Sequence, residues 1–175
     1  MKYKDAITNL MTEISKNEKV IFLGQGIINA GRMQGTLKNV PIDNCIEMPV
    51  AENLIVGTAM GLCLRGYRPV ITFAFMDFML VCADAIINHM ALMPKMSNNQ
   101  FSFPIIMRAV VGAQGDKFVM GAQHTKNLGY IFSPHINTVN FDKNITADML
   151  TKINEPLLII EKRDLYEQDI DTEVV

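Results

Sequence analysis

The chain lacks several features that would narrow its function class at once. It has no tryptophan and only 7% aromatic residues, and its 16 lysines and arginines face 18 aspartates and glutamates, for a formal net charge of −2. A balanced charge without a basic stripe is atypical of nucleic-acid binding, so we expect no nucleic-acid partner. Polar residues break the longest apolar runs well short of a membrane span, so we expect no membrane-spanning segment.

The cysteines and the first residues exclude further classes. Cys45, Cys63 and Cys82 are odd in number and widely spaced, so they form neither a Cys-x-x-Cys pair nor a disulfide framework. No N-terminal stretch joins a basic region, an apolar run and a cleavage site, and we therefore expect a cytoplasmic protein. No cluster of cysteine, histidine and acidic residues has the spacing of metal ligands.

The hydrophobic pattern alternates between strand-like and helix-like periods along the whole chain. Of the 175 residues, 49% are hydrophobic, which is normal for one globular domain. The periodicity predicts strands at 20–23, 43–46, 69–73, 104–110, 137–141 and 157–160, and helices at 4–16, 51–64, 77–93, 125–132 and 146–154. Ile- and Val-rich strands predict an α/β fold with a mainly parallel sheet and helices on both faces. We expect one domain over 1–163 and an acidic tail at 164–175 without a core pattern.

Four features follow predicted strands and so fall at one edge of the sheet. They are the segment 24–26, Glu52, the aromatic segment 73–78 and a glycine-rich loop that leads to His124. Because ligands of open α/β sheets bind beyond the carboxyl ends of the strands, this convergence predicts a site there.

Glu52 is an acid at the start of the otherwise apolar helix predicted at 51–64. No cation lies near it in sequence, so burial would favour its neutral form, which can donate a hydrogen bond in catalysis. The alternative is a solvated acid that suits the helix dipole. Gly57 and Gly61 on the same helix allow close approach of another backbone, either within the chain or across a subunit interface.

The aromatic residues and the histidines also have two interpretations. Phe73, Phe75 and Phe78 are typical of a core, yet a ring exposed at a strand end can stack on a flat heterocycle. His124 is either a satisfied polar residue or a functional one, and its position in a loop past a strand favours function. His89 and His135 look structural.

The segment 24–29, Gly-Gln-Gly-Ile-Ile-Asn, follows a strand and invites a dinucleotide-binding interpretation. Glu47 stands near the place of the acid that binds a ribose. Asn29, however, occupies the place of the third glycine, so the fingerprint is weak. A nucleotide-binding oxidoreductase is therefore the less favoured alternative.

Taken together, these segments resemble the pyrimidine-binding domain of thiamin-diphosphate enzymes. The resemblance runs from about residue 20 to 166 and is similar to the N-terminal half of the β chain of 2-oxo-acid dehydrogenases, a relative of the middle domain of transketolase. Several motifs in the right order carry it: VIFLG at 20–24, Glu52 through GYRP at 66–69, the segment 73–88, PIIMR at 104–108, GA at 112–113, AQH at 122–124 and PLLIIE at 156–161.

The resemblance implies a role for each candidate residue. Glu52 matches the glutamate that hydrogen-bonds the N1′ atom of the cofactor's aminopyrimidine, and Phe78 matches the aromatic residue that packs on that ring. His124 matches a histidine that faces the substrate. Gln25 stands at a cofactor-binding position where β chains commonly carry an acid.

The resemblance also implies shared cofactors and a partner. The family holds Mg²⁺ and the diphosphate with a Gly-Asp-Gly motif, and Gly115-Asp116-Lys117 is not that motif. Thiamin diphosphate and Mg²⁺ are therefore expected between this chain and a separate diphosphate-binding subunit that holds the metal. The expected assembly is an α2β2-like hetero-oligomer with self-association.

The function implied is that of a β-like subunit of a two-chain enzyme acting on a 2-oxo acid or ketose-like donor. Decarboxylation, acyl transfer and ketol transfer all remain open. The family's β chain also carries a second, C-terminal domain, which this sequence does not include, so the alternative is a catalytically idle regulatory or assembly subunit.

Overall fold

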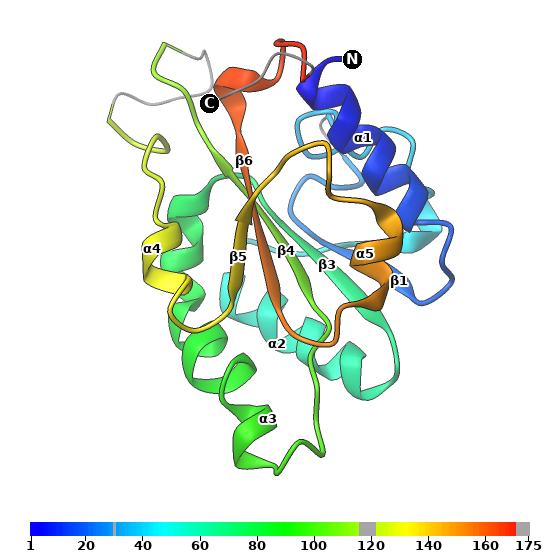
Figure 1. Cartoon of the computed structure of the whole chain (residues 1–175), viewed down its shortest axis with the longest axis vertical. Coiled ribbons are helices and arrows are strands. Elements are labelled where there is room, and N and C mark those ends of the chain that lie inside the picture. The colour runs from blue at the N-terminus through cyan, green and yellow to red at the C-terminus, as the bar shows by residue number, and fades with distance from the viewer. Residues whose placement is uncertain (30, 116–121, 171–175) are drawn as a thin grey trace.

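Six parallel strands form one sheet at the centre of the computed structural model, which describes residues 1–29, 31–115 and 122–170 (Figure 1). In spatial order they are β2 (Cys45–Glu47), β1 (Val20–Gly24), β3 (Arg68–Phe73), β4 (Ile106–Val111), β6 (Leu157–Lys162) and β5 (Asn137–Asn140). All five pairings are parallel, which confirms the predicted sheet.

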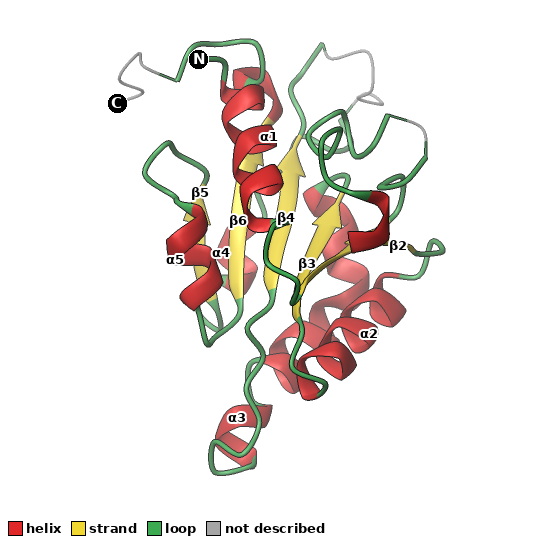
Figure 2. Ribbon diagram, turned by 90° about the vertical axis from the view of Figure 1, so that its right-hand side faces the viewer, coloured by secondary structure: helices red, strands yellow, loops and turns green. Residues whose placement is uncertain are grey.

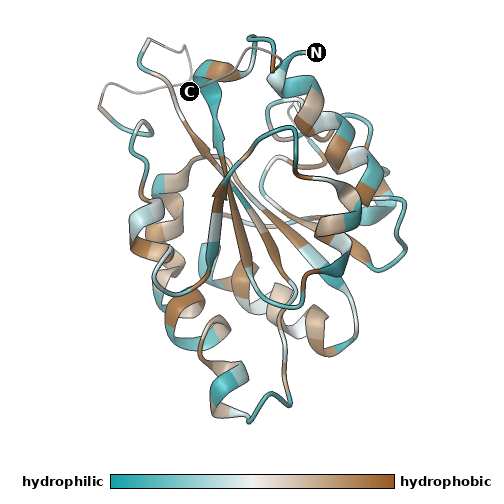
Figure 3. Ribbon diagram, viewed as in Figure 1, coloured by the Kyte–Doolittle hydropathy of each residue, from teal (hydrophilic) through white to brown (hydrophobic). Residues whose placement is uncertain are grey.

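Helices cover both faces of this sheet, as the sequence predicts. One core joins the sheet to α1 (Tyr3–Ile14) and α5 (Ala147–Lys152). The other joins it to α2 (Glu52–Leu64), η2 (Met76–Cys82), η3 (Ala85–Met90) and α4 (Gly129–Phe132). Figure 3 shows the central strands β3, β4 and β6 as mostly hydrophobic. Two further short helices are η1 (Ile42–Asn44) and η4 (Arg163–Leu165), and α3 (Met93–Met96) lies beyond the amino ends of the strands (Figure 2).

The segment predicted as one helix at 77–93 is helical over most of its length, but it forms short helices of different pitch. The 3-10 helix η2 precedes the π-helix η3, with a 66° bend between η2 and the segment Ala85–Met96. The buried residues are spaced by three, the 3-10 period, and then by four: Met76, Met79, Cys82, Ile86 and Met90. The tighter pitch turns every third side chain toward the sheet. Pro94, predicted to end the helix, instead lies in the first turn of α3.

No single helix among the described residues is long and apolar enough to cross a membrane. Only the bent pair Met76–Cys82 and Ala85–Met96, taken together, passes that test, and it does so on length and composition alone.

Residues 164–170 were predicted to belong to a tail without a core pattern, but they pack against α1. Tyr166 is 5% exposed, and its ring stacks on Tyr3 with the centroids 6.2 Å apart. The Tyr3 amide donates to the Gln168 carbonyl (2.9 Å), and the Ile170 amide donates to the Met1 carbonyl (2.9 Å). The core contact of this segment comes from the opposite end of the chain, which local patterning does not reveal. Residues 171–175 lie outside the described residues.

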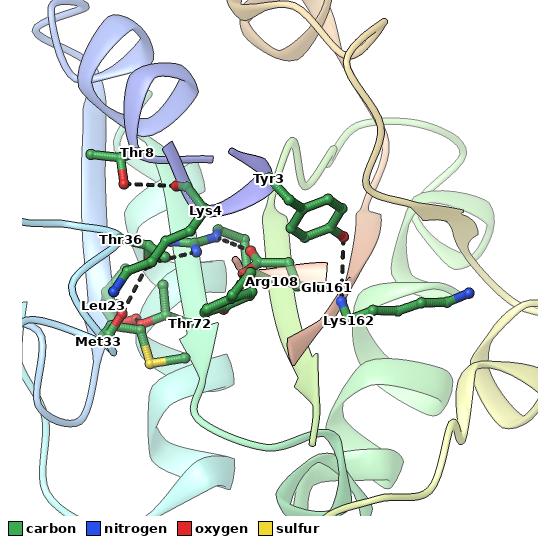
Figure 4. Close-up of polar contacts among 11 residues, drawn as sticks. Tyr3, Lys4, Thr8, Leu23, Met33, Thr36, Thr72, Arg108, Glu161 and Lys162 are labelled. Atoms are coloured by element: carbon green, nitrogen blue, oxygen red, sulfur yellow. Dashed lines mark hydrogen bonds and ion pairs between the residues drawn. The ribbon is translucent and has the colours of Figure 1, made fainter. Parts of the chain in front are cut away.

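A buried polar network crosses the sheet beneath α1 (Figure 4). Arg108 on β4 and Glu161 on β6 are each 1% exposed, and Arg108 Nε lies 2.6 Å from Glu161 Oε1. Arg108 Nη2 also donates to Thr36 Oγ1 (2.9 Å), and the Tyr166 hydroxyl donates to Glu161 Oε2 (3.0 Å). Burial, aided by the charge of Glu161, raises the pKa of Tyr166 well above 10. The network satisfies both oxygens of the buried acid, as a buried carboxylate requires.

Candidate active site at the carboxyl ends of the strands

A small cavity lies where β1 and β3 end and α2 begins. Its walls are Gln25, Glu52, Ile55, Thr72, Phe73, Ala74 and Phe78. Three residues singled out from the sequence, Gln25, Glu52 and Phe78, are thus brought together. The close approach of β1 to β3 at this edge requires Gly24, because a Cβ atom there would lie 2.7 Å from the Thr72 carbonyl oxygen.

Glu52 is the first residue of α2 and is 8% exposed. The positive end of the helix dipole favours a negative charge at this position. None of the hydrogen bonds or ion pairs among the described residues involves its carboxylate. Burial, together with the charge of Glu52, raises the pKa of the nearby Cys82 thiol to about 12. Cys82 is therefore neutral at pH 7, and Glu52 is an acid without a charged partner.

His124 joins the aromatic residues at the rim of this cavity. Its ring stacks on Phe75, with centroids 4.5 Å apart and an interplanar angle of 20°, and it meets Phe78 edge-on at 5.3 Å. Its carbonyl accepts a hydrogen bond from the Gly112 amide (2.7 Å), and its φ is 68°. The ring atom Nδ1 is buried and has no partner among the described residues. The glycine-rich loop before His124 lies outside those residues from 116 to 121.

Glu47 has a role that the sequence did not predict. Its carboxylate accepts hydrogen bonds from three consecutive amides of the loop after β1, those of Gly26 (2.5 Å), Ile27 (3.0 Å) and Ile28 (2.8 Å). Such a row of amides is a natural anion site, and here a side chain of the protein fills it. The dinucleotide interpretation of 24–29 is therefore not favoured, because these amides are no longer available to a pyrophosphate.

Gln25 and Phe75 complete the description of the predicted residues. The Gln25 amide donates to the Pro49 carbonyl (3.2 Å), which ties the loop after β1 to the segment just before Glu52. Phe75, rather than Phe78, stacks on His124. The spacing of the phenylalanines in the sequence did not indicate which of them contacts His124. His89 and His135 are exposed and lie away from the cavity. Among the described residues, no group of three or more His, Cys, Asp or Glu side chains could hold a metal ion.

A profile of the family "Transketolase, pyrimidine binding domain" matches residues 1–128 of this chain. The chain belongs to this family. As a pyrimidine-binding domain, it is 32% identical over 177 residues to the β subunit of the pyruvate dehydrogenase E1 component from Bacillus subtilis, covering 92% of this chain and 52% of that protein. It is 29% identical over 173 residues to the β subunit of acetoin:2,6-dichlorophenolindophenol oxidoreductase from Cupriavidus necator, covering 88% and 50%.

The pyrimidine-binding domain spans about half the length of these curated relatives. Solved structures share its fold. One is described as "Split gene transketolase, inactive beta4 tetramer", with a TM-score of 0.64, 18% identity, and coverage of 93% of this chain and 52% of that one. Another is a thiamine diphosphate-dependent 4-hydroxybenzoylformate decarboxylase from Rhodococcus jostii RHA1, with a TM-score of 0.62, 11% identity, and coverage of 92% and 31%.

Proposed function

We propose that this chain is the pyrimidine-binding, β-like subunit of a two-chain thiamin-diphosphate enzyme that acts on a 2-oxo acid or ketose-like donor. The observation that carries this proposal is Glu52, which is 8% exposed and whose carboxylate has no hydrogen-bond partner among the described residues, at the wall of an aromatic-rimmed cavity. Family membership and relatives named as β subunits of oxo-acid dehydrogenases support it.

The cavity, with about 10 Å³ of free space, is too small for a ring in this structure, but its side chains are of the kinds that an aminopyrimidine ring contacts. Such a ring needs an apolar flat surface and one polar group that exchanges a hydrogen bond with a ring nitrogen. Phe73 and Phe78 supply the apolar walls, and Glu52 supplies the polar group. When bound, thiamin diphosphate supplies a carbon nucleophile that attacks ketones and stabilises the resulting carbanion.

Each residue of the chain then has a task that its position supports. Glu52 exchanges a hydrogen bond with the N1′ atom of the ring, because its carboxylate has no other partner among the described residues. Phe78 holds the ring in place by packing. His124, fixed between Phe75 and Phe78, presents a ring nitrogen that moves a proton at the substrate side. Gln25 anchors the segment before Glu52.

The cofactor's diphosphate and Mg²⁺ are assigned to a partner subunit. The described residues offer no group of side chains that could hold a metal ion, and Mg²⁺ requires several oxygen ligands in a nearly octahedral arrangement. We propose that the partner brings these ligands in a Gly-Asp-Gly motif, so that the reaction centre lies between the two chains.

The exposed side of α2, the helix that begins at Glu52, supports a partner contact. A groove of about 520 Å³ with nearly all-apolar walls runs along Gly57, Met60, Gly61 and Leu64 toward Met93. A Cβ atom at Gly57 or Gly61 would meet nothing within 4 Å, so the helix backbone is open to a neighbour at both positions. Leu54 and Leu64 are 52% and 58% exposed. A helix that is apolar on all sides is typically buried on all sides.

The first experiment is native purification of the assembly from the source cell, with mass spectrometry of the intact complex. We expect a second chain with a Gly-Asp-Gly motif, together with thiamin diphosphate and Mg²⁺. A homo-oligomer without cofactor would contradict the enzyme proposal and favour the regulatory or assembly subunit.

A matched pair of variants locates the contact. Gly61→Leu fills the groove on α2 and should release the second chain from the complex. Gly66→Asn, at a position with φ of 80° at the exposed end of α2, should leave the complex intact, since asparagine tolerates this conformation. Retention of the second chain by Gly61→Leu would show that the partner docks elsewhere.

A further inference from the structure

Residues 31–35 form a turn of the wrong hand for L-amino acids. Their φ angles are all positive: 85°, 46°, 45°, 57° and 82°. Gly31 and Gly35, at the two ends, adopt such angles readily, but Arg32, Met33 and Gln34 do not. Three consecutive strained residues persist only where the surrounding contacts hold them, and such strain concentrates at functional sites.

Backbone and side-chain hydrogen bonds hold the turn closed. The Met33 amide donates to the Gly26 carbonyl (2.6 Å), and the Gly35 amide donates to the Gly31 carbonyl (2.5 Å). The Arg32 guanidinium donates to the carbonyls of Ile27 (3.1 Å) and Val40 (2.8 Å). Met33 is 4% exposed in the core beneath α1. Two of the three strained residues thus serve the loop and the core.

Gln34, the third strained residue, reaches the candidate active site. Its Nε2 atom donates to the Ala74 carbonyl (3.1 Å), and its Oε1 atom accepts from Arg163 Nη1. Ala74 lines the same cavity as Glu52. The next residue, Phe75, is the ring that stacks on His124. One amide side chain therefore connects the strained turn to the backbone that carries the aromatic rim.

We propose that Gln34 is a positioning residue of this site. Its N–H group fixes the Ala74 carbonyl and so sets the Phe75 ring against His124. The left-handed turn places this donor at the carboxyl end of β3. Arg163 orients the Gln34 amide through its oxygen, which leaves the nitrogen to face Ala74. The assignment rests on the proposed function for its catalytic meaning, but its geometry is testable in the isolated chain.

The test uses two substitutions that separate the two contacts of Gln34. Gln34→Glu keeps an oxygen for Arg163 but loses the N–H donor to Ala74, whereas Gln34→Ala loses both. The readout is the NMR resonance of the His124 ring C–H in the full chain labelled at histidine. Stacking on Phe75 shifts this resonance by the ring current of the phenyl group. His89 and His135, both exposed and distant, serve as internal references.

We expect both variants to move the His124 resonance toward the positions of His89 and His135, with those two unchanged. An unchanged His124 resonance in Gln34→Glu would overturn the proposal, since Arg163 would then be the contact that matters. Loss of the fold in both variants would also overturn it, because Gln34 would then be a structural residue. If only Gln34→Ala fails to fold, the His124 resonance of Gln34→Glu alone tests the proposal: a shifted resonance supports it and an unchanged one overturns it.

This readout needs neither cofactor nor partner, so its failure is distinct from a failure of the proposed function. In an active assembly, the same pair gives a second readout. Gln34→Glu and Gln34→Ala should lower kcat with an altered pH profile, because His124 is displaced. Arg163→Lys, which keeps the Ala74 bond, should retain the profile of the unchanged chain.

Discussion

Two buried glutamates sit on opposite faces of the same sheet and have opposite surroundings. Glu161 is 1% exposed, and its two oxygens are taken by Arg108 and by the Tyr166 hydroxyl. Glu52 is 8% exposed and has no such partner among the described residues. Both oxygens of Glu161 are already engaged within the core, whereas the carboxylate of Glu52 is open to a hydrogen bond with a ligand. Burial alone therefore does not distinguish these two acids; the absence of a partner does.

The largest expected effect comes from breaking the Arg108–Glu161 pair. Arg108→Met leaves the Glu161 charge buried without a cation, and we expect a loss of about 3–5 kcal/mol in the free energy of unfolding. Chemical denaturation measures it. The double variant Arg108→Met with Glu161→Leu should recover much of the loss, because no charge remains in the core. A double variant as unstable as the single one would show that packing, not charge, holds this region.

Replacing Glu52 should change turnover strongly and the free energy of unfolding very little. Glu52→Gln deletes a buried acid that has no partner, so we expect the free energy of unfolding to stay within about 1 kcal/mol of the unchanged chain. Turnover of the complete assembly should fall roughly 10²- to 10⁴-fold, the usual contribution of acid–base catalysis. Glu155→Gln, at an exposed acid in the loop before β6, is the control. Near-normal turnover in Glu52→Gln would contradict the mechanism.

The pKa of Tyr166 makes the stability of the Glu161 network depend on pH. Burial, and then the charge of Glu161, raises the pKa of Tyr166 above 10 in the folded chain. The folded state thus keeps a proton that the unfolded state releases, so this stabilisation is present in full below about pH 10 and is lost as pH rises toward the folded pKa. Denaturation curves from about pH 8 to 11 should show a decline that is weaker in Tyr166→Phe. Tyr3, whose pKa burial also raises, keeps part of the slope.

At neutral pH, Tyr166→Phe should cost about 1.5–3 kcal/mol, because it removes a hydrogen bond to a buried charge. Arg108 remains as a partner of Glu161, so the loss should stay below that of Arg108→Met. A larger loss would mean that the hydroxyl, rather than the guanidinium, is the main support of Glu161.

The smallest expected effect is at the aromatic rim. Phe75→Leu should lower the free energy of unfolding by about 0.5–1.5 kcal/mol through the lost contacts with His124 and Phe78. Thermal or chemical denaturation measures it, with Phe101→Leu at a 41% exposed ring as the control. A loss as large as that of Arg108→Met would place Phe75 in the core rather than at the rim.

The surroundings of Glu52 could be predicted from the sequence, whereas those of Glu161 could not. The strands, the apolar helix and the acid at its first position leave local patterns, so the sheet and the placement of Glu52 could be predicted. The Glu161 network could not, because Arg108 and Glu161 lie 53 positions apart and Tyr166 stands in a segment without a periodic pattern. The left-handed turn likewise gave no signal beyond its two glycines, and its contact with the site, the Gln34 bond to Ala74, joins residues 40 positions apart.

The packing of residues 164–170 against α1 has a practical consequence. An antiparallel bridge joins Lys2 to Asp169, and the N-terminal amine lies 3.1 Å from the Asp169 carboxylate. The first residues of the described chain thus lie beside residue 169. A short linker could join these two points, and new termini could open in the exposed turn at 98–100. Such a circular permutant would keep the strand order while changing which half of the sheet emerges first from the ribosome.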